Sequence, residues 1–225
     1  MSHSAIAHRL SGHYAEKPVS YFVGARHDFV DLLPPDPSAQ ILEVGCGAGA
    51  TGALALEQKK CARYVGIELM PEAATEARKV LSEVILGNIE EIALPAPPAT
   101  FDALILSEVV EHLVDPWTAL KRLAIMLKPG AIVLASSPNV ANWKILRQLS
   151  RGRFDYTERG TMDRTHLRWF TPATYRELFE HCGYAVDRVY PIVPLRPHQK
   201  AVSTMLGGRD HLFYAQICLS AHLKS

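Results

Sequence analysis

The feature that most constrains the fold is a regular alternation of short apolar runs with longer helical segments. The first run, 40–44, ends in a glycine-rich turn that leads into a helical segment, and the same unit then repeats along the chain. This alternation predicts an α/β fold, a doubly wound and mostly parallel sheet with helices on both faces. The expected strands are 40–44, 62–68, 83–86, 101–106, 131–135, 184–190 and 212–219, and the expected helices are 51–58, 71–81, 108–113, 116–127, 139–149 and 172–181.

The flanking and connecting segments suggest one domain. Apolar residues from Tyr21 to Leu33 recur at helical steps, and Pro34-Pro35 ends the helix. We expect residues 1–35 to form a helical lid and 139–171 to form an insertion on the substrate side. A length of 225 residues fits a single domain over 1–225.

Charge and cysteine usage exclude several classes of protein. The net charge of +1 gives no global field toward nucleic acid or an acidic membrane, although a local basic surface stays open. The four cysteines are far apart, which indicates neither a zinc knuckle nor a disulfide framework. The N-terminus lacks the apolar core of a signal peptide, and no apolar run approaches the roughly 20 residues of a bilayer span. We therefore expect a soluble, cytoplasmic protein.

A glycine-rich turn follows the first expected strand, with the spacing Gly45-x-Gly47-x-Gly49. Glycines there let backbone N–H groups approach a ligand closely, because no Cβ stands in the way. Glu68 ends the second strand, where an acid accepts hydrogen bonds from ribose hydroxyls in doubly wound folds. The glycine spacing is tighter than the G-x-G-x-x-G of dinucleotide-binding enzymes.

The segment 43–49 resembles motif I of class I S-adenosylmethionine (SAM)-dependent methyltransferases. The resemblance continues through 66–68, 87–90, 101–102 and 127–130 and covers nearly the whole chain. It implies SAM as the cofactor and a seven-stranded sheet whose last strand is antiparallel. The glycines would lie under the methionine part of SAM, Glu68 would bind the ribose, and Asn88 would contact the adenine amine. The cofactor-binding residues implied are Glu43, Gly45, Cys46, Gly47, Gly49, Glu68, Leu69, Asn88, Ile89 and Ser107.

A second group of polar residues follows the fourth strand. In a helix, Glu108, Glu111 and His112 would share one face, and two carboxylates with an imidazole suit Mg²⁺ or Mn²⁺. His166, in the polar loop 163–171, is the candidate fourth ligand. The two segments are similar to metal-dependent O-methyltransferases, including those that act on the 3′-terminal ribose of small RNAs and those of the ubiquinone pathway. Without a metal, His112 and His166 are candidate catalytic bases, or the acid and histidine cap the next helix.

The function implied is transfer of the SAM methyl group to a hydroxyl on a sugar, glycan or other small metabolite. The segment 139–171 is rich in arginine, resembles bacterial methyltransferases near polysaccharide-biosynthesis functions, and is expected to cover the acceptor side through its 163–170 part. Tyr14, Tyr21 and Arg26 are candidates for a lid over the SAM carboxylate, the alternative for Arg26 being a solvent-facing position. RNA ribose 2′-O-methylation, N- or C-methylation and a catalytically silent SAM-binding module are the other functions considered.

Overall fold

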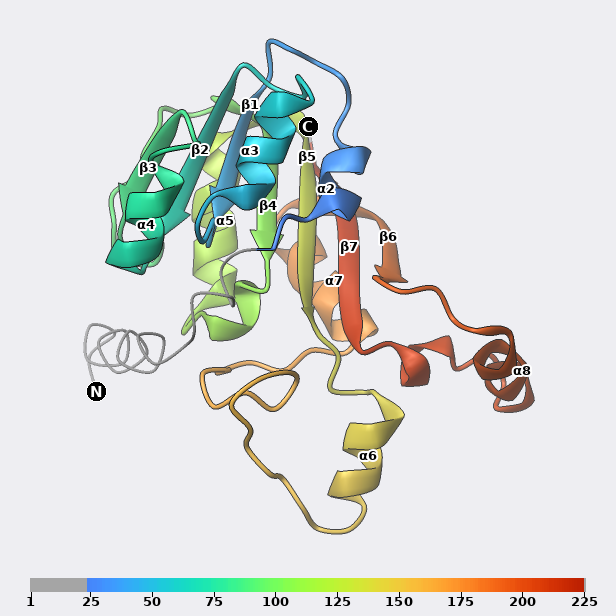
Figure 1. Cartoon of the computed structure of the whole chain (residues 1–225). Coiled ribbons are helices and arrows are strands. Elements are labelled where there is room, and N and C mark those ends of the chain that lie inside the picture. Colours follow the sequence, from blue (N-terminus) through green and yellow to red (C-terminus); the bar gives the residue numbers. More distant parts are fainter. Residues whose placement is uncertain (1–23, 225) are drawn as a thin grey trace.

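The computed structural model describes residues 24–224, which form a seven-stranded sheet with helices on both faces (Figure 1). The strand order is β3-β2-β1-β4-β5-β7-β6, and all neighbours pair in parallel except β7, which is antiparallel to β5 and β6. The α/β fold class and the antiparallel last strand are therefore confirmed. The strands are β1 (Gln40–Val44), β2 (Arg63–Glu68), β3 (Glu83–Leu86), β4 (Phe101–Ser107), β5 (Leu127–Pro138), β6 (Tyr184–Pro191) and β7 (Gln216–Leu223).

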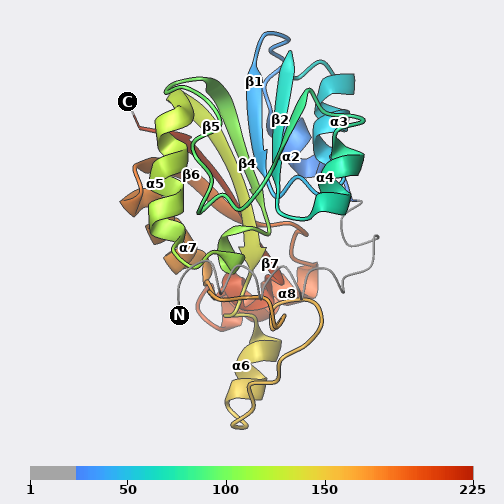
Figure 2. The same cartoon turned by 90° about the vertical axis from the view of Figure 1, so that its left-hand side faces the viewer.

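The helices divide between the two faces of the sheet, as Figure 2 shows from the side. Helices α2, α3 and α4 cover one face, and α5 and α7 cover the other. Helix α6 extends below the sheet in both views, and α8 lies next to η3 in the segment that connects β6 to β7. The helices are α2 (His27–Leu32), α3 (Ala50–Glu57), α4 (Pro71–Ala77), α5 (Pro116–Met126), α6 (Trp143–Leu149), α7 (Pro172–His181) and α8 (Pro197–Met205), with 3-10 turns η2 (Val110–His112) and η3 (Asp210–Phe213).

The central strands are buried on both faces, so each contributes to two hydrophobic cores. On β1, Ile41 packs with Phe29 and Tyr64 under α2 and α3, whereas Leu42 packs with Phe179 under α5 and α7. Successive side chains of a strand point to opposite faces, and for this reason β1 carries apolar residues on both faces, Ile41 on one and Leu42 and Val44 on the other, with Glu43 buried among them.

The order of the strands reverses between β1 and β4. The chain leaves β1 toward α3 on one face, and it leaves β4 toward α5 on the other. A crevice opens at the carboxyl ends of the strands where this reversal occurs, and ligands bind there in open α/β sheets. The fold thus places the segments that follow Val44 and Ser107 next to each other.

Several elements differ from the sequence-based expectation. The expected helix 108–113 is only the short turn η2, because Glu108 adopts a left-handed backbone conformation with φ of 54°. The last strand lies at 216–223 instead of 212–219, since residues 210–213 form η3. Helix α8 was not expected, because the prolines and glycines around it suggested a loop.

The other boundaries shift by a few residues. Helix α6 begins at Trp143, since Asn142 caps it by accepting a hydrogen bond from Lys144 N–H, and β5 is longer than expected. The part of the expected lid before Gly24 lies outside the described residues. No helix in the described range 24–224 is long and apolar enough to cross a membrane.

Candidate functional site

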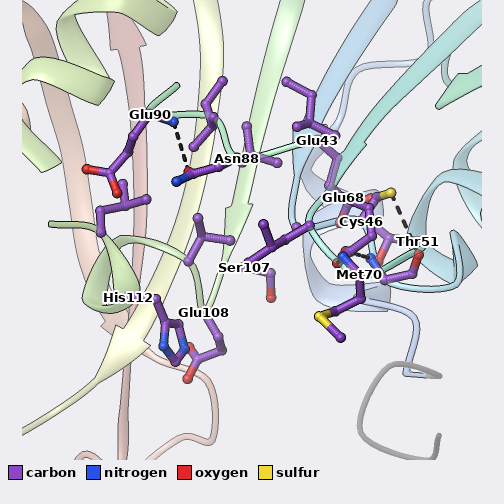
Figure 3. Close-up of a pocket in the computed structure, with 18 of the residues that line it drawn as sticks. Glu43, Cys46, Thr51, Glu68, Met70, Asn88, Glu90, Ser107, Glu108 and His112 are labelled. Atoms are coloured by element: carbon purple, nitrogen blue, oxygen red, sulfur yellow. Dashed lines mark hydrogen bonds between the residues drawn. The ribbon is translucent and has the colours of Figure 1, made fainter. Parts of the chain in front are cut away.

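A cavity of about 390 Å³ lies at the carboxyl ends of β1, β2 and β4. This volume falls in the range of small-molecule sites. Figure 3 shows Glu68, Cys46 and Thr51 on one side of the cavity and His112 with Glu108 on the other. The cavity therefore joins the predicted cofactor half to the predicted acceptor half.

The glycine-rich turn forms one wall of this cavity. Gly45 and Gly47 line it, and both adopt positive φ values of 71° and 54° that residues with a Cβ rarely adopt. A Cβ on Gly45 would lie 2.7 Å from the Val109 side chain. Gly49, by contrast, does not line the cavity. It begins α3 with φ of 85° and packs against α4, so its need for glycine is structural.

Glu68 holds the turn in place. Its carboxylate accepts hydrogen bonds from the N–H groups of Gly47 and Met70, each at 2.8 Å. Burial raises the pKa of Glu68, and these N–H groups oppose the rise. An acid held in this way at the end of β2 faces the cavity where the predicted ribose contact would lie.

Asn88 lines the cavity after β3. Its Oδ1 accepts a hydrogen bond from Glu90 N–H at 3.0 Å. The Glu90 carboxylate in turn accepts from the N–H groups of Val114 and Asp115, which ties the β3 loop to the start of α5. An amide oxygen has two lone pairs, so Asn88 retains acceptor capacity for the predicted adenine contact.

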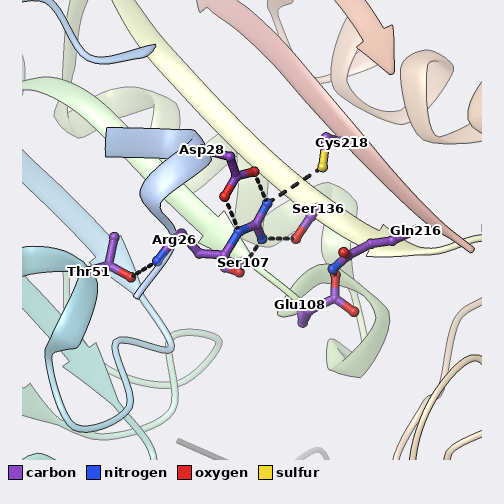
Figure 4. Close-up of polar contacts among 8 residues, drawn as sticks. All are labelled: Arg26, Asp28, Thr51, Ser107, Glu108, Ser136, Gln216 and Cys218. Atoms are coloured by element: carbon purple, nitrogen blue, oxygen red, sulfur yellow. Dashed lines mark hydrogen bonds and ion pairs between the residues drawn. The ribbon is translucent and has the colours of Figure 1, made fainter. Parts of the chain in front are cut away.

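Arg26 lies in the wall of the cavity with its guanidinium held by protein groups (Figure 4). It donates to both carboxylate oxygens of Asp28 and to the hydroxyls of Ser107 and Ser136, at 2.6–2.8 Å. Burial opposes the charge, but the hydrogen bonds and charge of Asp28 raise the pKa of Arg26. The solvent-facing alternative for Arg26 is therefore wrong. Tyr14 and Tyr21, the other lid candidates, lie outside the described residues.

Glu108 faces the same cavity from the end of β4. Its Oε1 accepts a hydrogen bond from Gln216 Nε2 at 2.5 Å (Figure 4). Burial raises the pKa of Glu108, while Gln216, Ser136 and the Arg26 charge lower it. The side chain is thus directed to β7, on the far side of β5.

Glu111 is the most unusual acid of the site. It is 1% exposed, and neither of its carboxyl oxygens has a hydrogen-bond partner among residues 24–224. Burial and the neighbouring Glu108 charge hold its pKa well above the usual range. A buried carboxyl group without partners is costly, which makes it a candidate for binding a proton or a cation.

Two histidines lie beside Glu111. The ring centroids of His112 and His166 are 4.7 Å apart, and the ligand atoms of the two rings and of Glu111 lie within 4.8 Å of one another. His112 Nδ1 donates to the carbonyl of Thr165, and His166 Nδ1 donates to that of Thr161, each at 3.1 Å. A neutral imidazole with its proton on Nδ1 carries its lone pair on Nε2.

The loop that carries His166 is anchored on η2. The Glu111 carbonyl accepts hydrogen bonds from the N–H groups of Leu167 and Arg168, at 2.8 and 2.9 Å. Val140 N–H donates to the Phe170 carbonyl and closes the base of the 139–171 insertion. These backbone contacts bring two segments that are more than 50 residues apart to one side of the cavity.

The cavity gathers most of the expected site residues. Every predicted cofactor-binding residue except Gly49 lines it, as do Glu108, His112 and His166. Sequence reasoning missed several lining residues that carry no motif of their own, among them Met70, Val109, Leu113 and Val114. Met70 and Val109 lie two residues after the ends of β2 and β4, and Leu113 and Val114 lie between η2 and α5, where no sequence pattern marks them.

Known proteins agree with this architecture. A family model described as a methyltransferase domain matches residues 13–189, and the chain belongs to this family of SAM-dependent class I methyltransferases. The chain is 31% identical to a ubiquinone biosynthesis O-methyltransferase of Xylella fastidiosa, over 79% of this chain and 73% of that protein. A protein of the same description from Xanthomonas campestris is 31% identical over 131 residues, and the match spans only 53% of its length.

Solved structures share the fold. A methyltransferase of Haloferax volcanii, solved in a complex with the Trm112 methyltransferase activator, superimposes with a TM-score of 0.66 at 16% identity, over 98% of each chain. A SAM-dependent methyltransferase of Mesorhizobium loti gives a TM-score of 0.62 at 16% identity, over 88% of this chain and 98% of that chain. At this identity the likeness establishes the fold alone.

The position of Glu68 generates a binding prediction. Glu68→Ala should weaken SAM binding by about 1–3 kcal/mol, because a charge-assisted acceptor is lost and the Gly47 N–H loses its partner. Titration calorimetry on the folded variant measures this change. The control is Glu72→Ala, which removes an exposed acid of α4. Equal SAM affinity in both variants would refute the role of Glu68.

Buried Glu43 generates a pH prediction. Burial raises its pKa from 4.5 to about 8, despite the hydrogen bond from Tyr64. The folded chain keeps this proton while the unfolded chain releases it, so the free energy of unfolding decreases as pH rises through this window. Glu43→Gln stays uncharged and should remove up to about 1.4 kcal/mol of this decrease for each pH unit.

Urea unfolding at several pH values between 4.5 and about 8 measures the effect. Glu72→Gln, at an exposed position, should leave the pH dependence of the wild type unchanged. If Glu43→Gln also leaves it unchanged, Glu43 is ionised in the folded protein and the argument from burial fails.

Proposed function

We propose that this chain transfers the methyl group of SAM to a hydroxyl oxygen of a small molecule. The observation that carries the proposal is the continuity of one cavity, which Glu68 and the glycine-rich turn line on one side and His112 and His166 on the other. The relatives named O-methyltransferases support an oxygen acceptor. Bound SAM supplies an activated methyl group, and the chain's contribution is to position the acceptor and take up its proton.

The two histidines suit the proton-accepting part of this reaction. Each donates from Nδ1 to a backbone carbonyl, which fixes the ring and leaves the lone pair on Nε2. Both line the cavity, so a hydroxyl bound there can reach one of them. The backbone anchor from Leu167 and Arg168 to Glu111 holds the loop closed on this side.

Small hydroxyl compounds are favoured over RNA as acceptors. The cavity volume of about 390 Å³ suits a small ligand, and the net charge of +1 gives little general attraction to a polyanion. Sugars and glycan building blocks belong to the same chemical class. Gly160, Asp163 and His166 of the insertion 139–171 line the cavity, which supports assigning this wall to the acceptor.

The test is acceptor-dependent formation of S-adenosylhomocysteine. The protein is incubated with SAM and, separately, with sugars, phenols and hydroxy acids, and the product is measured by mass spectrometry. At least one hydroxyl class should accelerate product formation, and the corresponding methyl ether should not. Normal SAM binding without any accelerated turnover would favour the silent SAM-binding module instead.

We further propose that Glu111, His112 and His166 bind a divalent cation. The fit rests on the buried Glu111 carboxyl group without partners in the described chain and on three ligand atoms within 4.8 Å of one another. Bonds of about 2.0–2.3 Å to one ion hold adjacent ligands roughly 3–4 Å apart, so a small inward movement of these three side chains would let them share an ion. With Glu108 directed to Gln216, two imidazoles and one carboxylate remain, which favours Mn²⁺ over Mg²⁺. A bound cation would lower the pKa of the acceptor hydroxyl.

Metal removal tests this site. EDTA should suppress methyl transfer and Mn²⁺ should restore it, and Glu111→Gln should weaken Mn²⁺ binding at least about tenfold in calorimetry. Glu177→Gln, which changes an exposed acid of α7, is the control and should bind Mn²⁺ normally. Full turnover in EDTA would end the metal proposal and leave His112 and His166 as candidate bases.

A further inference from the structure

One part of the fold extends away from the sheet and from both hydrophobic cores. We call residues 143–160, which comprise α6 and the loop after it, the projection. Figures 1 and 2 show it below the carboxyl ends of the strands in both views. All of its residues are exposed except Ile145 and Asp155, which are half-buried. The projection contributes nothing to the two cores. Phe154 and Tyr156 pack beside the Trp169 ring, and the exposed faces of the apolar side chains that remain need another explanation.

The projection carries a group of large apolar side chains. Trp143, Leu146 and Leu149 recur at three-residue steps and lie on one side of α6. Phe154 and Tyr156 follow in the loop, with ring centroids 5.3 Å apart. These five side chains are each between 40 and 55% exposed. A cluster of this kind on one protruding segment marks an interaction surface.

Positive charge accompanies the apolar residues. The projection contains five cations and two acids, so it is more positive than the chain as a whole with its net charge of +1. Helix α6 holds no acid, and the two acids of the loop, Asp155 and Glu158, are paired with arginines. The cations without an ion pair to any described residue are Lys144, Arg147, Arg151 and Arg159.

We propose that the projection docks on an anionic membrane surface. Helices that lie in a bilayer interface combine apolar and aromatic residues on one side with Lys and Arg on the other. Anionic lipids attract each basic residue near the surface, while the apolar side chains enter the headgroup boundary. The charge complementarity favours such lipids over a protein partner, because α6 carries cations without acids to pair with a mixed protein surface.

The projection is connected to the cavity, so docking would affect where the cavity faces. The projection continues directly into Gly160, Asp163 and His166, which line the acceptor side. A membrane contact at 143–156 would bring this wall of the cavity toward the lipid headgroups. The docking goes beyond the proposed methyl transfer and does not depend on it, because the surface residues and the cavity residues are different.

Vesicle flotation tests the proposal. The full chain is mixed with vesicles of phosphatidylcholine alone or of an equimolar mixture of phosphatidylglycerol and phosphatidylcholine. We expect the protein to float with the mixed vesicles and to be released by high salt, since surface charges are screened. Binding to neither vesicle, or equal binding to both, would overturn the proposal.

Matched variants separate the contribution of the apolar side chains to vesicle binding from that of the positive charges. Leu146→Ser with Leu149→Ser should reduce binding about tenfold or more for each leucine, and Arg147→Glu should reduce it by at least about fivefold. The controls are Ile125→Ser and Lys121→Glu on α5, which make the same kind of change at exposed positions away from the projection and should bind normally.

Two further measurements show which explanation holds when vesicle binding fails. Sedimentation velocity without lipid reports self-association, and a dimer that the double leucine variant abolishes, with no vesicle binding, would make the surface a protein interface and refute membrane docking. SAM affinity, measured by calorimetry on the same proteins, should be unchanged in all variants. If the wild type itself does not bind SAM, the proposed function is contradicted. Failure of membrane docking and failure of the proposed function can therefore be told apart.

Discussion

The divergence of the chain at the β1–β4 pair is the constraint on which the site depends. The two strands pair in parallel, yet the helices that follow them lie on opposite faces of the sheet. The backbone segments after Val44 and Ser107 must therefore separate, and the space between them becomes the cavity. Glu68 and Asn88 reach that space from the neighbouring strands on one side only, which makes the two halves of the cavity chemically different.

The two halves of the cavity differ in how their buried carboxyl groups are hydrogen-bonded. On the cofactor side, backbone N–H groups donate hydrogen bonds to Glu68 and offset part of the free energy of burying its carboxylate. The Tyr64 hydroxyl does the same for Glu43. On the acceptor side, Glu111 is buried beside Glu108, and its carboxyl oxygens form no hydrogen bond with the described residues, although the Ser137 hydroxyl is near enough to oppose the rise in its pKa. Natural structures retain few such groups, and those that persist are often functional.

The sequence predicted the sheet well, because buried parallel strands and capped helices leave strong local patterns. It also predicted which strand ends carry polar residues. It could not predict that Glu108 lies outside a helix, since the spacing of three and four residues fits a helix equally well. The pairing of Glu108 with Gln216, 108 residues away, has no local signal. Helix α8 was missed because proline begins it and glycines end it, which also suits a loop.

The contacts of Arg26 have a consequence for the order in which the chain folds. Its guanidinium contacts Cys218, 192 residues further along, as well as serines on β4 and β5. During synthesis Arg26 emerges long before β7 exists, so its final surroundings cannot form until the last strand has paired with β5. Long-range contacts of this kind form slowly. The wall of the cavity around Arg26 is therefore complete only when β7 is present, and a nascent chain that lacks β7 does not yet hold a finished site.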